Sequence, residues 1–345
     1  MHGEVTATAC ILGCSGPRLT PDEQAFFSAV RPWGFILFKR NVETPDQVRA
    51  LVAALRASVE RDNAPVLIDQ EGGRVQRLGP PHWRRYPPGR AYGELGANDP
   101  LQRREITRLG ARLMAHDLVA LGINVDCLPV LDVPDPDAHD VIGDRAYGQD
   151  VDTVALLGRA AAEGMIAGGV LPVIKHIPGH GRARSDSHLD LPVVTAAWDD
   201  LDARDFAPFK ALSDMPMAMT AHVVYTAVDP RLPATTSRTV MRRVIRGAIG
   251  FAGLVMSDDL SMKALSGSFA ERTRAALSAG CDIALHCNGD MAEMTAVADA
   301  TGPLSGRART RAAAALDRLP KIAEPFDVDE ARARFDAAFG GRWAA

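Results

Sequence analysis

The sequence predicts a single-domain α/β protein with the architecture of a (β/α)8 TIM-type barrel. Eight short apolar runs alternate with longer segments of helical periodicity, as expected of parallel strands that are each followed by a crossover helix. The runs are apolar throughout, which is typical of strands covered on both faces. A length of 345 residues suits one large α/β domain. A doubly wound open sheet is the competing architecture, and it is disfavoured because no Gly-x-Gly-x-x-Gly turn follows the first strand.

The predicted strands are spread along most of the chain. They are residues 6–12, 34–38, 65–68, 123–130, 170–174, 217–220, 254–256 and 283–285. In a barrel their carboxyl ends converge on one face, where catalytic residues are placed.

Helical segments fill the intervals between the strands. The clearest start is Thr44-Pro45-Asp46-Gln47, which predicts an N-cap at Thr44, a first-turn proline and a capping box completed by Gln47. The other predicted helices are residues 101–121, 151–167, 201–212 and 269–279.

The end of the chain predicts a small addition to the barrel rather than a second domain. Residues 1–323 are assigned to the catalytic barrel and residues 324–345 to a C-terminal helical extension. The extension contains an amphipathic helix over residues 329–339, which we expect to pack on the outside of the barrel.

Composition excludes several classes of partner. The net charge is −4 and the basic residues are dispersed, so no nucleic acid is expected. No apolar run has the length of a membrane span or of a signal peptide, and we expect no membrane partner. The five cysteines lie mostly in apolar runs, as reduced, buried thiols do. These features predict a cytoplasmic protein, which we expect to be a monomer.

Polar residues gather where the predicted strands end, which predicts a single pocket on one face of the barrel. They are Lys39 and Arg40, Asp69 to Glu71, Asp132, Lys175 and His176, His222, Asp258 and Asp259, and His286 with Asn288.

Three motifs in this set carry a family resemblance. The first is Lys175-His176-Ile177-Pro178-Gly179-His180-Gly181, followed after four residues by Asp186-Ser187-His188. The second starts at Asp69-Gln70-Glu71-Gly72-Gly73-Arg74, and the third is Ser257-Asp258-Asp259-Leu260-Ser261-Met262. In this order and spacing they resemble the family 3 glycoside hydrolases, specifically the single-domain bacterial β-N-acetylhexosaminidases of cell-wall recycling. The resemblance implies removal of terminal non-reducing β-linked N-acetylglucosamine from anhydro-muropeptides, a small-molecule carbohydrate substrate.

The resemblance also implies the catalytic residues. Hydrolysis with retention needs a carboxylate that attacks the anomeric carbon and an acid that protonates the leaving oxygen. The resemblance makes Asp258 the nucleophile, and His188, oriented by Asp186, the acid/base. Histidine suits this role because it titrates near neutral pH. The neighbouring Asp259 is better interpreted as a helix cap.

Five further residues are predicted to bind the sugar. Asp69 follows the third predicted strand, where a carboxylate can accept hydrogen bonds from sugar hydroxyls. The residues that match sugar-binding positions of the family are Arg77, Arg145, Lys175 and His176. Arg74 is assigned a structural role that bridges Glu71 or its neighbours, and Asp126 and Asp132 are expected to orient Arg145 from behind. The glycines Gly179 and Gly181 predict a loop that closes over the sugar.

Neither a metal nor a cofactor is expected. His176 and His180 are four residues apart, but Pro178-Gly179 between them forbids the regular helix that makes this spacing useful for zinc. His180 receives no chemical role.

Two other functions stay open on the sequence. A histidine acid/base would tolerate an incoming phosphate dianion better than a carboxylate would, so a β-N-acetylglucosaminide phosphorylase is one alternative. A non-catalytic sugar-binding barrel is the other.

Overall fold

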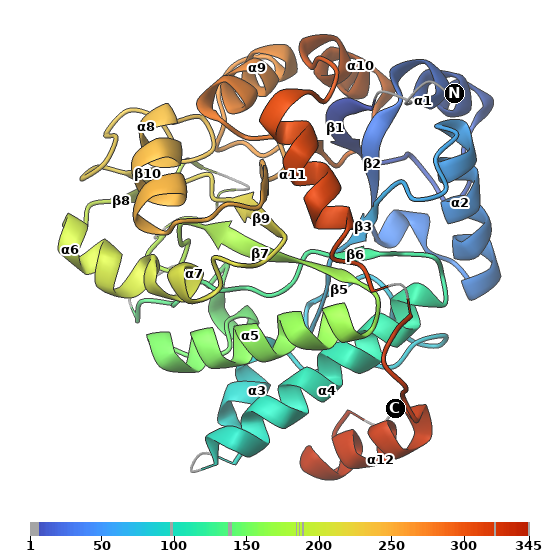
Figure 1. Ribbon diagram of the computed structural model, residues 1–345, viewed down its shortest axis with the longest axis vertical. Helices are drawn as coiled ribbons and strands as arrows, with labels where there is room; N and C mark the ends of the chain where they lie inside the picture. Colours follow the sequence, from blue (N-terminus) through green and yellow to red (C-terminus); the bar gives the residue numbers. More distant parts are fainter. Residues whose placement is uncertain are drawn as a thin grey trace.

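The predicted barrel is present and closed. The computed structural model describes residues 7–96, 99–136, 140–183, 185, 187, 190–320 and 322–343. Within these ranges eight parallel strands form one sheet in the order β11-β9-β7-β6-β3-β2-β1-β12 (Figure 1). The ring closes between its first and last members, because Met256 bridges to Ile283 in parallel and the Ser257 N–H donates to the Ile283 carbonyl at 3.0 Å.

Each predicted apolar run overlaps one barrel strand. The strands are β1 (Thr8–Leu12), β2 (Pro32–Leu37), β3 (Val66–Ile68), β6 (Val125–Asp126), β7 (Leu171–Ile177), β9 (Met217–Thr220), β11 (Leu254–Met256) and β12 (Ala284–His286). The fourth strand is shorter than predicted. Its ladder ends at Asp126, and pairing resumes only as an isolated bridge between Val130 and Lys175, after Pro129, which has no N–H to donate.

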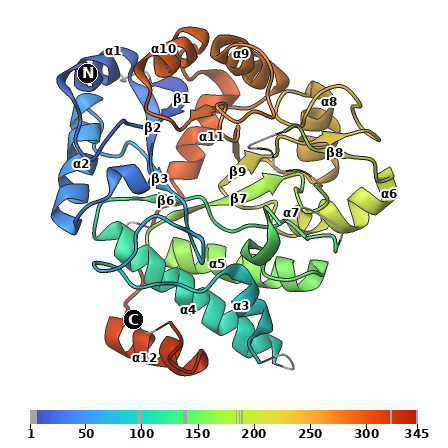
Figure 2. The same ribbon diagram turned by 180° about the vertical axis from the view of Figure 1, so that it is seen from behind.

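Helices surround the ring of strands (Figures 1 and 2). They are α1 (Pro21–Val30), α2 (Pro45–Ser58), α3 (Gly89–Glu94), α4 (Pro100–Val119), α5 (Val151–Ala167), α6 (Trp198–Asp200), α7 (Ala207–Ala211), α8 (Arg238–Val240), α9 (Phe269–Ala279), α10 (Met291–Ala300), α11 (Gly306–Leu316) and α12 (Val328–Ala338). The single helix predicted over residues 201–212 is wrong: a π-helical turn over Leu201–Asp205 separates α6 from α7. Pro208 in the first turn of α7 has no N–H with which to continue an earlier helical ladder.

The N-terminus of α2 differs in one detail from the predicted capping box. The Thr44 hydroxyl accepts from the Gln47 N–H at 3.3 Å, as predicted for an N-cap. The Gln47 side chain accepts instead from the Glu43 N–H at 2.8 Å. Its amide also donates to the Asn41 carbonyl at 3.0 Å, so this glutamine ties the helix to the preceding turn.

The interior of the barrel is a packed core. Inward-facing apolar residues from all eight strands, such as Ile11, Leu67 and Val173, form one buried cluster. Ala312 and Ala315 of α11 belong to the same cluster, so α11 closes one end of the barrel and lies across it in both views (Figures 1 and 2). That end contains the amino termini of the strands, which leaves the opposite end for the site.

The C-terminal helix α12 lies beside α3 and α4 (Figure 1). Its Phe335 is fully buried and packs edge-on against Tyr86, with ring centroids 6.2 Å apart. Arg84 also pairs with Asp336 of this helix. These contacts attach the C-terminal segment to the outer helical layer.

Two short sheets continue the chain beyond the carboxyl ends of the barrel strands. The hairpin of β4 (Gln70–Gly72) and β5 (Val75–Gln76) directly follows β3, and the pair of β8 (Val193–Val194) and β10 (Val224–Tyr225) is parallel. The five cysteines are free and buried. No helix in the described part of the chain is long and apolar enough to span a membrane.

Candidate active site

A cavity of about 280 Å³ lies at the carboxyl ends of the barrel strands. Its described wall includes the charged residues Asp69, Glu71, Arg77, Arg145, Lys175, Asp258 and Asp259, the residues His176, His180 and Ser187, and apolar side chains that include Phe38, Ile142 and Met262. The five predicted sugar-binding residues and the predicted nucleophile therefore share one pocket, although they come from distant parts of the chain.

Strand alternation explains why these residues face inward. Side chains two residues apart lie on the same face of a strand. Leu254 and Met256 belong to the inner core, so Asp258 follows them into the pocket. Leu171 and Val173 place Lys175 in the same way. His176 also lines the pocket, and the Lys175–His176 peptide bond is cis.

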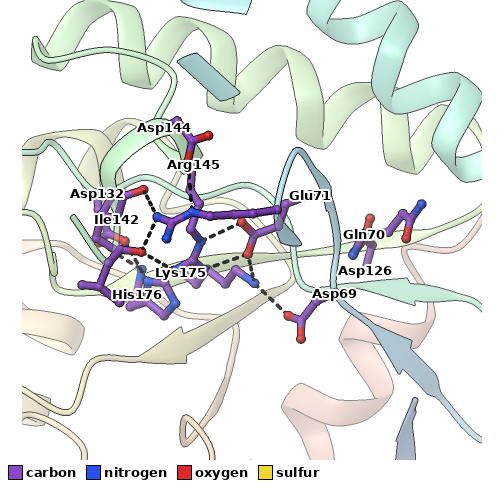
Figure 3. A network of polar contacts seen from close by, with 12 residues as sticks. Asp69, Gln70, Glu71, Asp126, Asp132, Ile142, Asp144, Arg145, Lys175 and His176 are labelled. Carbon is purple, nitrogen blue, oxygen red and sulfur yellow. Dashed lines mark hydrogen bonds and ion pairs between the residues drawn. The ribbon is translucent and has the colours of Figure 1, made fainter. Parts of the chain in front are cut away.

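A dense network of ion pairs crosses the pocket (Figure 3). The Nζ of Lys175 contacts the Oδ1 of Asp69 at 2.9 Å and the Oε1 of Glu71 at 2.6 Å. Arg145 binds both oxygens of Glu71, each at 2.8 Å, and Arg77 binds the Oδ2 of Asp69 at 2.9 Å. Lys175 thus bridges two carboxylates that are each held by a separate arginine.

This network determines the charge states of its members. Burial alone would raise the pKa of Glu71, but Arg145 and Lys175 lower it to about 2. Burial likewise opposes ionisation of Asp69, and Lys175 and Arg77 outweigh it and hold the pKa of this carboxyl below its usual range. Burial would lower the pKa of Lys175, but the two carboxylates raise it. The network therefore stays fully charged at neutral pH.

The sequence places Glu71 among the polar residues at the strand ends but gives it no binding role. The predicted bridge from Arg74 to Glu71 is wrong. Arg74 pairs with Asp144 at 3.1 Å and donates to the Val141 carbonyl at 3.0 Å, while Glu71 is 5% exposed between Arg145 and Lys175. Its inward parity with Asp69, two residues before it, was the available signal.

The expectation that Asp132 orients Arg145 is wrong. Asp132 contacts His176 and His180 instead. Its Oδ2 contacts the Nδ1 of His176 at 2.7 Å, and its Oδ1 accepts from the His180 N–H at 2.6 Å. Burial raises the pKa of Asp132, but His176 and these hydrogen bonds lower it below its usual value. Arg145 is held by Glu71 instead, because that carboxylate offers a bidentate partner.

Asp126 also has a different role from the one expected. It accepts a hydrogen bond from the Gln70 N–H at 2.9 Å and therefore supports the main chain between Asp69 and Glu71. Burial raises its pKa well above the usual value. A neutral carboxylic acid at this position is compatible with the acidic residues around it.

The nucleophile candidate Asp258 is anchored by its own neighbour. The Asp259 N–H donates to the Oδ1 of Asp258 at 2.8 Å. Burial disfavours the carboxylate, but His176 and His222 offset burial and lower the pKa of Asp258. The side chain is consequently a carboxylate at neutral pH, as a nucleophile must be.

Asp259 is not a helix cap. It accepts from the Ser261 N–H at 3.0 Å and from the Cys287 N–H at 3.2 Å, so it stabilises a turn and the end of β12. The next helix, α9, is capped by Ser268. The cap prediction failed because a two-residue turn and a helix start both favour aspartate at the same position.

The predicted acid/base pair, Asp186 and His188, lies outside the described residues. Ser187, which stands between them in the chain, is 3% exposed and lines the pocket. Its carbonyl accepts from the Ala264 N–H at 3.2 Å, and its hydroxyl lies 3.3 Å from the Nε2 of His180.

His180, for which the sequence predicts no chemical role, lines the pocket. Burial and the neighbouring His176 lower its pKa to about 4, so the ring is neutral. The following glycine is required by close packing, because a Cβ on Gly181 would lie 2.1 Å from the Val133 carbonyl oxygen.

Several polar residues at the strand ends do not line the pocket. Arg40 donates to the Cys14 carbonyl at 2.9 Å behind the wall. His286 faces away from the barrel interior, against the ring of Phe269, because its neighbour Leu285 takes the inward position. Lys39, Asn288 and His222 are also outside the described wall. Among the residues described, no group of three or more His, Cys, Asp or Glu side chains is arranged to hold a metal ion.

The charge state of Glu71 makes a pH-dependent prediction. Its folded pKa of about 2 lies below its ordinary value of 4.5, so its stabilisation is present above about pH 4.5 and is lost as the pH falls through about 2. Replacing Glu71 by Gln is expected to lower the free energy of unfolding by about 3 kcal/mol at neutral pH. Urea unfolding from pH 7 to pH 2 should show the gap to wild type shrinking below about pH 4.5.

The exposed Glu43 provides the matched control. Its replacement by Gln should leave the free energy of unfolding unchanged within about 0.5 kcal/mol over the same range. A gap for the Glu71 variant that stays constant down to pH 2 would contradict the assigned charge state.

Comparison with known proteins agrees with this geometry. The model of the glycosyl hydrolase family 3 N terminal domain matches residues 22–319. A β-hexosaminidase of Alkalilimnicola ehrlichii is 41% identical over 282 residues, which are 81% of this chain and 80% of that protein. A β-hexosaminidase of Thiobacillus denitrificans is 40% identical over 313 residues, which are 88% and 86% of the two chains.

Solved structures extend the similarity to the whole chain. NagZ from Neisseria gonorrhoeae, in complex with N-trifluoroacetyl-D-glucosamine, has a TM-score of 0.84 and 30% identity, with 99% of each chain covered. A family 3 β-N-acetylglucosaminidase from Paenibacillus has a TM-score of 0.84 and 32% identity over 96% of this chain and 66% of its own. The chain therefore belongs to the family 3 glycosyl hydrolases, and within them it groups with the β-hexosaminidases.

Proposed function

We propose that this β-hexosaminidase removes terminal, non-reducing β-linked N-acetylglucosamine with retention of configuration. The observation that carries the proposal is the position of Asp258. Its ionised carboxylate lies on the wall of the cavity that also contains the network of Asp69, Glu71 and Lys175. A carboxylate nucleophile and a dense set of groups that can bind hydroxyls meet in one cavity.

The reaction needs two steps. In the first, a carboxylate oxygen of Asp258 attacks the anomeric carbon, the glycosidic bond breaks, and the acid/base delivers a proton to the leaving oxygen. In the second, the same acid/base removes a proton from water, which attacks the glycosyl-enzyme and releases Asp258. The products are free N-acetylglucosamine and the aglycone.

We assign the acid/base role to His188, with Asp186 as the residue that orients it. The support is the family resemblance of this Asp-Ser-His segment together with the buried position of Ser187 on the pocket wall. A hydrogen bond from one imidazole nitrogen to a carboxylate would fix the tautomer and stabilise the charged ring.

The sugar-binding roles follow from the ion-pair network. Asp69 can accept hydrogen bonds from sugar hydroxyls, and Arg77, Lys175 and Arg145 can donate to them. Glu71 supplies the negative charge that holds Lys175 and Arg145 in the pocket. The gonococcal relative in complex with N-trifluoroacetyl-D-glucosamine supports an N-acylated hexosamine as the bound sugar.

We further propose that the natural substrates are N-acetylglucosaminyl anhydro-muropeptides and that the enzyme acts in peptidoglycan recycling in the cytoplasm. This assignment rests on the family resemblance. Incubation with purified anhydro-muropeptides, followed by mass spectrometry, should show loss of one N-acetylglucosamine per molecule.

A comparison of two aryl glycosides tests the activity. We expect kcat/KM for 4-nitrophenyl N-acetyl-β-glucosaminide to exceed that for the matching β-glucoside by roughly 10²-fold or more, because buried polar groups that bind the acetamido group would be left without partners. The sugar product should be free N-acetylglucosamine at every phosphate concentration. Equal rates on both glycosides would refute the specificity, and a sugar phosphate product would identify a phosphorylase.

A further inference from the structure

A chain of buried polar side chains lies behind Asp258, outside the pocket wall. Its members are Thr220 at the end of β9, His222 two residues later, and Thr235 in the segment after β10. The relative exposure of all three is 0%. Buried polar groups destabilise a protein unless they are hydrogen-bonded, and these three side chains find their partners in one another and in the main chain around Asp258.

Hydrogen bonds connect these three side chains to one another and to the main chain of Asp258 and Asp259. The Asp258 N–H donates to the Thr220 hydroxyl at 3.3 Å, and that hydroxyl lies 2.8 Å from the hydroxyl of Thr235. The Thr235 hydroxyl lies 2.7 Å from the Nδ1 of His222. The Nε2 of His222 lies 3.0 Å from the Asp259 carbonyl oxygen. This chain of hydrogen bonds thus starts at the N–H of Asp258 and ends on the carbonyl of the next residue.

The proton positions in this chain of hydrogen bonds can be assigned from chemistry. A carbonyl oxygen only accepts, so the Nε2 of His222 must carry a proton. Burial lowers the pKa of His222, and in the resulting neutral ring Nδ1 accepts from the Thr235 hydroxyl. The Thr220 hydroxyl then donates to the Thr235 oxygen. The Ala221 carbonyl is a second acceptor for Thr235, but at 3.1 Å it is more distant than Nδ1.

We propose that Thr220, Thr235 and His222 form a positioning relay that orients the carboxylate of Asp258 for attack on the anomeric carbon. The relay holds the main chain on both sides of Asp258, and the Asp259 N–H then holds one carboxylate oxygen, Oδ1, at 2.8 Å. We assign attack to the other oxygen, Oδ2. The proposal rests on the proposed role of Asp258 as nucleophile.

The relay can be broken without changing the size of a side chain. Thr235→Val removes the hydroxyl and keeps the shape, whereas Thr235→Ser keeps the hydroxyl and removes a methyl group. A misplaced nucleophile slows formation of the glycosyl-enzyme without weakening sugar binding. We expect Thr235→Val to lower kcat for the aryl N-acetyl-glucosaminide roughly 10- to 100-fold, with the Kd for N-acetylglucosamine within about twofold of wild type. Thr235→Ser should stay within about threefold of the wild-type kcat.

The measurements are stopped-flow glycosylation rates, product binding by calorimetry, and circular dichroism to establish folding. A Thr235→Val enzyme with wild-type kcat would overturn the relay. Equal losses of kcat in the Val and Ser variants would also overturn it, because they would indicate an effect of packing alone. The Val and Ser variants of Thr220 give the same comparison if a Thr235 variant fails to fold. Labelling of the wild-type enzyme by a slow substrate separates the nucleophilic role of Asp258 from the relay. If Asp258 is not labelled, the proposed nucleophile is wrong. If Asp258 is labelled, the Thr235 variants test the relay alone.

Discussion

Replacing Asp258 by Ala is expected to lower kcat on 4-nitrophenyl N-acetyl-β-glucosaminide by roughly 10⁴-fold or more. On the proposed mechanism this variant cannot form the glycosyl-enzyme, so the step that breaks the glycosidic bond is lost. Asp258 lies at the inward position after β11, where His176 and the hydrogen bond from the Asp259 N–H favour its charged form against the effect of burial. Among the other described carboxylates of the pocket wall, Asp69 and Glu71 are ion-paired with Lys175 and the arginines, and Asp259 accepts hydrogen bonds from the main chain of Ser261 and Cys287.

Azide adds a stereochemical readout to this variant. In Asp258→Ala an azide ion could enter the space of the lost carboxylate and attack from the same side, which would give the α-glycosyl azide. The exposed Asp62 provides a control, because Asp62→Asn should keep wild-type kcat. Retention of more than about a hundredth of the wild-type rate by Asp258→Ala, with no response to azide, would exclude a nucleophilic role.

Replacing His188 by Ala is expected to have the second largest effect, and its size should depend on the leaving group. General acid catalysis contributes roughly 10² to 10⁴ where the leaving oxygen needs a proton. The kcat/KM should therefore fall by this factor for a disaccharide or methyl glycoside. It should change little for a 2,4-dinitrophenyl glycoside, whose leaving group departs as an anion. Steady-state kinetics over a series of aryl glycosides measures this dependence as a steeper Brønsted slope.

Two comparisons make the His188 test specific. Azide should accelerate turnover of His188→Ala at the second step and give the β-glycosyl azide, the opposite anomer to that from Asp258→Ala. The exposed His82→Ala variant controls for loss of a histidine away from the pocket. An equal loss of kcat/KM for all leaving groups would show that His188 does not protonate the leaving oxygen.

Much of the fold was predictable because it follows from local patterns. Each of the eight strands is a short apolar run, and α5 and α9 have the predicted bounds. The region of residues 201–212 was not predictable in this way, since its periodicity is that of one helix although Leu201–Asp205 form a π-helical turn. Leu201 and Phe206 are both fully buried there.

The site residues also differ in whether a local sequence pattern predicts their position. Asp69, Lys175 and Asp258 could be placed from the sequence, because each lies within two residues after the end of a predicted strand and strand parity directs it inward. The pairing of Arg145 with Glu71, across 74 positions of the chain, depends on how the barrel closes and leaves no local signal. The hydrogen bonds through Thr235 were not predictable either, because Thr235 lies in a segment that is neither strand nor helix.

The central claim is that Asp258 becomes covalently attached to the sugar, and trapping the intermediate tests it most directly. The enzyme would be incubated with a slow 2-fluoro glycoside, digested, and analysed by mass spectrometry. We expect one added glycosyl residue per chain, located by fragmentation on Asp258, and no label on the Asp258→Ala variant. Active enzyme that accumulates no adduct, or carries the label on another side chain, would contradict it.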